Sequence, residues 1–148
     1  MTTEDSRELV DRWFTEFWGE LNPDIVDELG AEDMLFHYPL VGEARGRAEV
    51  RARIVGFAEL FPDGGFTLTD DLLVDGDRVA ARWEGGATHT GAAWELPIGV
   101  LPEASGRTMD YTGTTVYHVR DGTVAAELGQ ADYLRAMRQL GLVEPTIE

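Results

Sequence analysis

The sequence predicts an α+β domain in which N-terminal helices pack on a strongly curved, mostly antiparallel sheet that leads into a short C-terminal helix. Two observations predict it. Helical hydrophobic periodicity dominates residues 5–61, and alternating segments separated by glycine-containing turns dominate residues 66–132. Helices that precede a run of strands are typical of α+β folds, with the helices on one face of the sheet. A curled sheet closed by helices encloses a cone-shaped cavity, so a cone-shaped barrel is expected.

The composition is that of a single globular domain over residues 1–148. The chain has no Cys and no Lys, which excludes thiolate nucleophiles, disulfides and Schiff-base chemistry. A formal net charge of −16 disfavours nucleic-acid binding, because the phosphate backbone is itself an anion. No apolar run is long enough to span a membrane and the N-terminus lacks the pattern of a signal peptide, so a cytoplasmic protein without membrane contact is expected.

The first half of the chain reads as helices around one strand. The expected elements are a helix over 5–21, a short helix over 22–30, a strand over 32–38 and a helix over 47–61, with a loop over 42–46. Trp13 and Phe17 lie on the apolar stripe of the first helix. They are candidate walls of an apolar ligand site, although the same stripe can simply be core.

The second half reads as strands. We expect strands over 66–74, 78–90 and 108–119, then a hairpin at Arg120-Asp121-Gly122, a strand that ends near Asp132, and a helix that ends at Gly141. The pair Gly85-Gly86 predicts a β-bulge. Residues 92–106 form a long connection rich in apolar side chains, which indicates that it covers a pocket mouth or a partner subunit.

The last strand carries the main candidate for chemistry. Because side chains alternate along a strand, one face holds Val124, Ala126, Leu128, Gln130 and Asp132. That face is apolar except for its last two members, Gln130 and Asp132. An amide and a carboxyl group at the end of a buried row resemble the polar floor of a pocket. A carboxyl group enclosed by apolar neighbours would have the raised pKa that a base for carbon acids needs. The alternative is that Asp132 only caps the helix that follows it.

The turn before this strand decides which neighbour faces the same way. A three-residue turn would place His118 on the face of Asp132, where it could polarise a substrate carbonyl. A two-residue turn at Asp121-Gly122 would direct Tyr117 inwards instead. We expect the three-residue turn.

The remaining candidates are weaker. Gln130 would bind the ligand or orient Asp132, and Leu128 would line the pocket beside it. His37 ends a strand and is as consistent with lining the cavity as with a structural role, whereas His89 favours a structural role. The spacing of the three histidines matches no ligand motif, so no metal is expected.

Several short motifs resemble one family in their order and spacing. They are Gly86-Ala87-Thr88-His89-Thr90-Gly91, Gly106-Arg107, Val119-Arg120-Asp121-Gly122, Asp132 and Gln139-Leu140-Gly141. In these the chain resembles the SnoaL-like polyketide cyclases of the nuclear-transport-factor-like superfamily. The resemblance implies a cofactor-free intramolecular aldol reaction on a polyketide ester, with Asp132 as general acid and base and His118 as a pocket histidine. The sequence departs from the family at Leu128, where Trp is common, at Gly129, where Asp is common, and in a longer loop at 101–105.

These observations favour a cyclase, dimeric or tetrameric, that acts on a hydrophobic small molecule. Three alternatives remain open. Arg82 and Glu84 share a strand face and, with Asp132, could form the acid, base and arginine set that epoxide hydrolases of the same superfamily use, although a surface ion pair is the simpler interpretation. Related members also isomerise or hydroxylate their substrates, and the cone could instead bind a hydrophobic molecule without chemistry.

Overall fold

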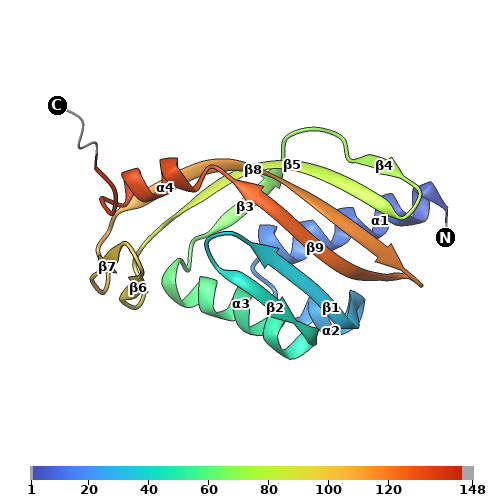
Figure 1. Ribbon diagram of the computed structural model, residues 1–148, viewed down its shortest axis with the longest axis horizontal. Helices are drawn as coiled ribbons and strands as arrows, with labels where there is room; N and C mark the ends of the chain where they lie inside the picture. Colours follow the sequence, from blue (N-terminus) through green and yellow to red (C-terminus); the bar gives the residue numbers. More distant parts are fainter. Residues whose placement is uncertain (1, 145–148) are drawn as a thin grey trace.

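The computed structural model describes residues 2–144 and confirms the predicted α+β architecture (Figure 1). In chain order the elements are α1 (Thr3–Phe14), the π-helix η1 (Thr15–Gly19), α2 (Asp24–Leu29), β1 (Gly30–Tyr38), β2 (Gly42–Arg45), α3 (Gly46–Leu60), β3 (Gly65–Leu68), β4 (Leu73–Asp75), β5 (Arg78–Thr88), β6 (Trp94–Leu96), β7 (Gly99–Leu101), β8 (Thr108–Arg120), β9 (Thr123–Ala131) and α4 (Tyr133–Gln139). Within residues 2–144, none of the helices has the length and apolar character needed to cross a bilayer.

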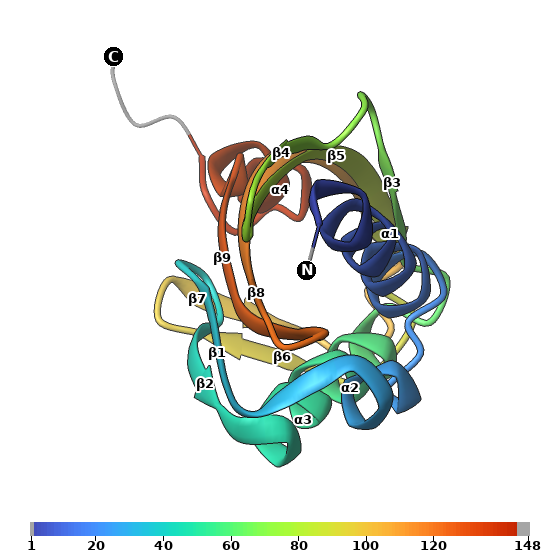
Figure 2. The same ribbon diagram turned by 90° about the vertical axis from the view of Figure 1, so that its right-hand side faces the viewer.

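One mixed sheet forms the body of the fold. Its strand order is β2-β1-β9-β8-β5-β3, and β4 adds to β5. All pairs are antiparallel except β1 with β9, which run parallel. Figure 2 shows β5, β8 and β9 curving around the side on which α1 lies. The inner face of the sheet and the helices therefore enclose the core.

Three segments differ from the expected elements. The expected loop over 42–46 contains β2, which pairs with β1. The expected strand over 66–74 is divided into β3 and β4 by a bend at Thr69 and Asp70, although the N–H of Thr69 still donates to Arg82 of β5. The connection over 92–106 contains the β6–β7 hairpin, which lies at the same end of the molecule as α4 (Figure 1).

The first helix begins with a capping box, in which Thr2 and Asp5 each accept a backbone hydrogen bond from the other. Its C-terminal part widens into the π-helix η1. In a regular α-helix, residues five apart point about 140° away from each other. The wider π-turn reduces this angle. As a result, Trp13 and Trp18 both direct their indole N–H groups toward the same carboxylate, that of Glu127.

The hairpin between β8 and β9 differs from the prediction in two ways. Arg120 pairs with Thr123 across the two-residue turn Asp121-Gly122, in which both φ angles are positive (51° and 76°). In addition, Val119 pairs with Val124 but His118 pairs with Ala126, so Ala125 is an extra residue that forms a β-bulge.

The turn and the bulge set the inward faces of the two strands. The two-residue turn directs Tyr117 inwards, so the expected three-residue turn is wrong. Beyond the bulge the side-chain alternation changes phase, and odd-numbered residues of β9 face the core. Glu127 and Gly129 are therefore buried, and Leu128, Gln130 and Asp132 are not.

Candidate functional site

An apolar cavity of about 50 Å³ lies between the inner face of the sheet, α3 and α4, with the β6–β7 hairpin at its side. Its lining residues are Trp18, Tyr38, Leu40, Val41, Phe57, Phe66, Trp83, Trp94, Met109, Tyr111, Tyr133, Ala136 and Met137. Within residues 2–144, no charged side chain lines it. Such an aromatic enclosure suits an uncharged, hydrophobic ligand.

A buried carboxyl group lies behind the cavity wall. Glu127 of β9 has no exposed surface, and its two oxygens accept three hydrogen bonds. Trp13 Nε1 donates to Oε1 at 2.8 Å, whereas Trp18 Nε1 and Tyr38 Oη donate to Oε2 at 2.7 and 2.5 Å. All three donors are neutral, so the carboxylate is hydrogen-bonded but has no counter-charge.

This environment leaves Glu127 close to its titration point at neutral pH. Burial raises the pKa of Glu127 to about 7, although the hydrogen bonds from Tyr38, Trp18 and Trp13 oppose the rise. Burial and the neighbouring charge of Glu127 raise the pKa of Tyr38 well above its usual value, so Tyr38 keeps its proton. A carboxyl group with a pKa near the working pH is what proton-transfer catalysis requires.

Tyr38 connects this carboxyl group to the cavity. Its ring lines the cavity, and its hydroxyl lies between Glu127 Oε2 and Thr115 Oγ1, which is 2.9 Å away. Trp83 Nε1 also donates to Thr115 Oγ1 at 2.9 Å. When Glu127 is ionised, Tyr38 donates to it. When Glu127 is protonated, its O–H can donate to Tyr38, which then donates to Thr115. The cluster thus accommodates both protonation states without moving a heavy atom.

Gly129 makes room for this arrangement. It faces Thr115 across the β8–β9 pair, and a Cβ atom placed on it would lie 1.9 Å from Cε1 of Tyr38. The ring of Tyr38 therefore occupies the space of the missing side chain. The buried carboxyl group of β9 lies two residues earlier, at Glu127.

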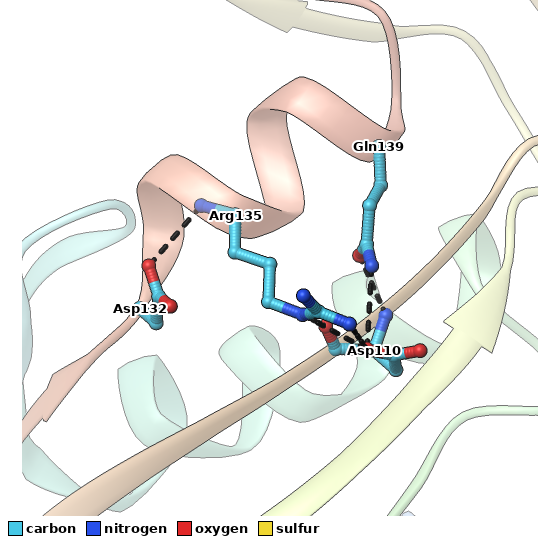
Figure 3. Close-up of polar contacts among 4 residues, drawn as sticks. All are labelled: Asp110, Asp132, Arg135 and Gln139. Carbon is cyan, nitrogen blue, oxygen red and sulfur yellow. Dashed lines mark hydrogen bonds and ion pairs between the residues drawn. The ribbon is translucent and has the colours of Figure 1, made fainter.

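Asp132 lies elsewhere, and the expectation that apolar side chains enclose it is wrong. It is exposed and caps α4: its carboxylate accepts a hydrogen bond from the backbone N–H of Arg135 at 3.1 Å (Figure 3). The side chain of Arg135 turns to Asp110, which also bonds Gln139 (Figure 3). The physical reason is the bulge at Ala125, which shifts the alternation and directs residue 132 outwards. The catalytic role of Asp132 stays a prediction.

The other predicted residues of this face are also outside the cavity. His118 is half-buried on the outer side of β8, and burial together with Arg78 lowers its pKa. Gln130 is exposed and Leu128 half-buried, since the bulge moves both from the inner face. His37 is exposed on β1 because its inward neighbours are Phe36 and Tyr38. None of these side chains lines the aromatic cavity.

Trp13, Phe17 and His89 are fully buried and none of them lines the cavity, although Trp13 donates to Glu127 behind it. Trp13 and Phe17 stack with their ring centroids 5.1 Å apart, behind Trp18, which lines the cavity in their place. His89 fixes the connection over 92–106: its Nε2 donates to the carbonyl of Ala92 at 2.5 Å, and its Nδ1 bonds Ser105 Oγ at 2.8 Å. The structural interpretation of His89 therefore agrees with its contacts.

The acid, base and arginine set of the epoxide-hydrolase alternative does not assemble. Arg82 is exposed and lies 3.9 Å from Asp70, and Glu84 is exposed on the same outer face of β5. The simpler interpretation, a surface ion pair, fits Arg82, but its partner is Asp70, and no ion pair of Glu84 is found among the described residues.

Sequence reasoning missed Glu127 and Tyr38. One signal was present: Glu127 is the only charged residue between Asp121 and Asp132, in a strand of otherwise uncharged residues. A charged residue in such a strand is either at the surface or in a site, and only the bulge decides which.

Comparison with known proteins gives a consistent result. The sequence model of the SnoaL-like polyketide cyclase family matches residues 8–140. TsrD from Streptomyces laurentii is 25% identical, with 97% of this chain and 99% of that chain covered and a TM-score of 0.77. A putative polyketide cyclase from Acidithiobacillus ferrooxidans is 26% identical over 97% of this chain and all of that one, with a TM-score of 0.75.

A putative SnoaL-like polyketide cyclase from Jannaschia sp. CCS1 shares the fold, with 21% identity, 97% of this chain and 95% of that chain covered, and a TM-score of 0.79. Among curated proteins, none matches the sequence. These likenesses confirm the resemblance read from the short motifs and support an enzyme of the cyclase type. The chain belongs to the SnoaL-like polyketide cyclase family.

Proposed function

We propose that the protein closes a ring in a hydrophobic, polyketide-type substrate by an intramolecular aldol reaction inside the aromatic cavity. Glu127 acts as the base and Tyr38 carries the proton to it. The observation that supports this proposal is the pairing of a fully buried carboxyl group, whose pKa is about 7, with a tyrosine that reaches both it and the cavity. Family membership supports the reaction class.

The chemistry conserves protons and needs no second reactant. A carbon flanked by two carbonyl groups loses its proton to Tyr38 Oη as the hydroxyl proton of Tyr38 moves to Glu127 Oε2. The resulting enolate attacks an internal carbonyl carbon. The new alkoxide then takes the proton back along the same path, which returns Glu127 to its ionised form.

Substrate entry requires the cavity to enlarge. Pockets that hold drug-sized ligands measure roughly 300–1,000 Å³. The 50 Å³ observed is therefore too small for a polyketide. The β6–β7 hairpin is the wall with the least support: Trp94 lines the cavity, whereas Ile98 and Val100 are exposed. We expect this hairpin to move outwards when substrate enters.

Deuterium exchange tests the proposal without knowledge of the natural substrate. The protein is incubated in heavy water with a panel of aryl 1,3-diketones and polyketide esters, and loss of the acidic C–H signal is followed by NMR. Glu127→Gln and Tyr38→Phe should each slow the catalysed exchange about 100-fold or more, since general-base catalysis contributes that much. Melting temperature and near-ultraviolet circular dichroism verify that the variants fold.

Asp132→Asn is the matched comparison, because Asn caps a helix about as well as Asp but cannot accept a proton. If Glu127 is the base, exchange by this variant stays within about twofold of wild type. Loss of exchange in Asp132→Asn, with Glu127→Gln still active, would assign the reaction to Asp132 instead. A wild-type protein that binds these compounds without exchanging their protons would be a binding protein rather than a cyclase.

A further inference from the structure

Two tyrosines at the α4 end of the cavity have hydroxyl groups that the protein does not use. Tyr111 of β8 is 8% exposed, and Tyr133 is the first residue of α4. Both line the cavity, and their ring centroids are 5.7 Å apart. Within residues 2–144, no hydrogen-bond partner is found for either hydroxyl. Tyr133 is half-buried, and neither hydroxyl is among the buried polar atoms that lack a partner, so both are open to a ligand or to water.

The two hydroxyls are donors at neutral pH. Burial raises the pKa of Tyr111, and burial together with the proximity of Tyr111 and Glu127 raises the pKa of Tyr133. Both phenols therefore keep their protons and can donate them to an acceptor. By contrast, the polar atoms of Trp18, Tyr38 and Trp83 on the same cavity wall already donate to Glu127 or Thr115.

The surroundings exclude an anionic acceptor. No charged side chain among the described residues lines the cavity, and the nearby Arg135 is exposed and paired with Asp110. A carboxylate placed in this cavity would lose its water without gaining a counter-charge, which is costly. A ketone or ester oxygen has a much smaller desolvation cost and accepts two hydrogen bonds through its lone pairs.

We propose that Tyr111 and Tyr133 together bind a neutral carbonyl oxygen of the substrate, so that the cavity accepts ketones and esters and rejects free carboxylic acids. This rests on the proposed function only in taking the cavity as the substrate site. In the aldol reaction, the same two donors would stabilise the negative charge that develops on that oxygen.

Binding of three probes of similar shape tests the proposal without any turnover. They are acetophenone, α-methylstyrene, in which a CH₂ group replaces the carbonyl oxygen, and benzoate. Methyl-¹³C methionine NMR reports on the cavity directly, because Met109 and Met137 line it. Wild type should bind acetophenone more tightly than either other probe. Tyr111→Phe and Tyr133→Phe should each weaken acetophenone binding about two- to tenfold and leave α-methylstyrene binding unchanged.

Tyr117→Phe is the matched control. Tyr117 lies on the same strand as Tyr111, is fully buried and has no hydroxyl partner among the described residues, but it does not line the cavity. It should leave all three affinities unchanged. Equal binding of acetophenone and α-methylstyrene by wild type, binding of benzoate as tight as that of acetophenone, or no binding of any probe would each overturn the proposal. Deuterium exchange that survives Glu127→Gln would instead refute the assignment of the base and leave this carbonyl preference standing.

Discussion

Glu127→Gln should change how stability depends on pH, and the size of the change follows from the buried cluster. In the unfolded chain the carboxyl group titrates near its ordinary pKa of 4.5, whereas in the fold it titrates at about 7. Between these values the folded state holds a proton that the unfolded state has released. Stability therefore falls as the pH rises through this window, and the contribution of Glu127 is constant above it.

Each pKa unit corresponds to about 1.4 kcal/mol, so the full window is worth about 3 kcal/mol, and the part between pH 5.5 and pH 7.5 about 2 kcal/mol. The variant has no proton to exchange at this position. It should be less stable than wild type at pH 5.5, because the amide nitrogen faces indole or hydroxyl donors and leaves one of them unpaired. The difference between the two proteins should then shrink by about 2 kcal/mol as the pH reaches 7.5.

Urea denaturation followed by tryptophan fluorescence measures this at constant ionic strength, and the carboxyl groups common to both proteins cancel in the difference. The same substitution at Glu84, which is exposed on β5, is the control and should give a curve parallel to wild type. If the difference in unfolding free energy between wild type and Glu127→Gln stays constant from pH 5.5 to 7.5, the reasoning is refuted, because the folded state then does not hold the extra proton.

Three further predictions concern the supports of the site. Gly129→Ala should destabilise the protein by about 1–3 kcal/mol and displace the ring of Tyr38, visible as a changed near-ultraviolet spectrum, because the new methyl group has no space; unchanged stability would contradict the close approach. Asp132→Ala should cost about 1 kcal/mol in urea denaturation and Asp132→Asn almost nothing, as expected for a helix cap; equal losses would show that charge rather than capping matters. His89→Ala should lower the free energy of unfolding by about 2 kcal/mol or more and expose residues 92–106 to limited proteolysis, because it removes the hydrogen bonds to Ala92 and Ser105. An unchanged digestion pattern would mean that other contacts hold this segment.

The order and type of most elements could be predicted because they depend on local patterns. Helical periodicity located the N-terminal helices, and turn-forming residues located the ends of β5, β8 and β9. Elements that depend on pairing partners were harder. The strand β2 exists because β1 offers it an edge. The β6–β7 hairpin forms in a segment expected to be a connection, although apolar residues alternate from Trp94 to Val100.

The candidate site was misplaced for one physical reason. A strict alternation over residues 124–132 places Leu128 and Asp132 on the inner face, but this reasoning holds only while the strand is regular. A single extra residue, Ala125, reverses the alternation for the rest of β9. The small, uncharged side chain of Ala125 gives no sequence signal for a bulge. The Asp121-Gly122 pair did favour the two-residue turn that is observed, and following it would have placed Tyr117 inside.

The cluster around Glu127 also has a consequence for how the chain is synthesised. Trp13 and Trp18 belong to the first elements made by the ribosome, but the carboxylate that they bind lies 114 and 109 residues later. The strand β1 must likewise wait for β9, its parallel neighbour. The carboxylate partner of these two indole N–H groups is therefore absent until translation is almost finished. Nascent chains that stall before β9 should be prone to aggregation and dependent on chaperones, because contacts so distant in sequence form late and slowly.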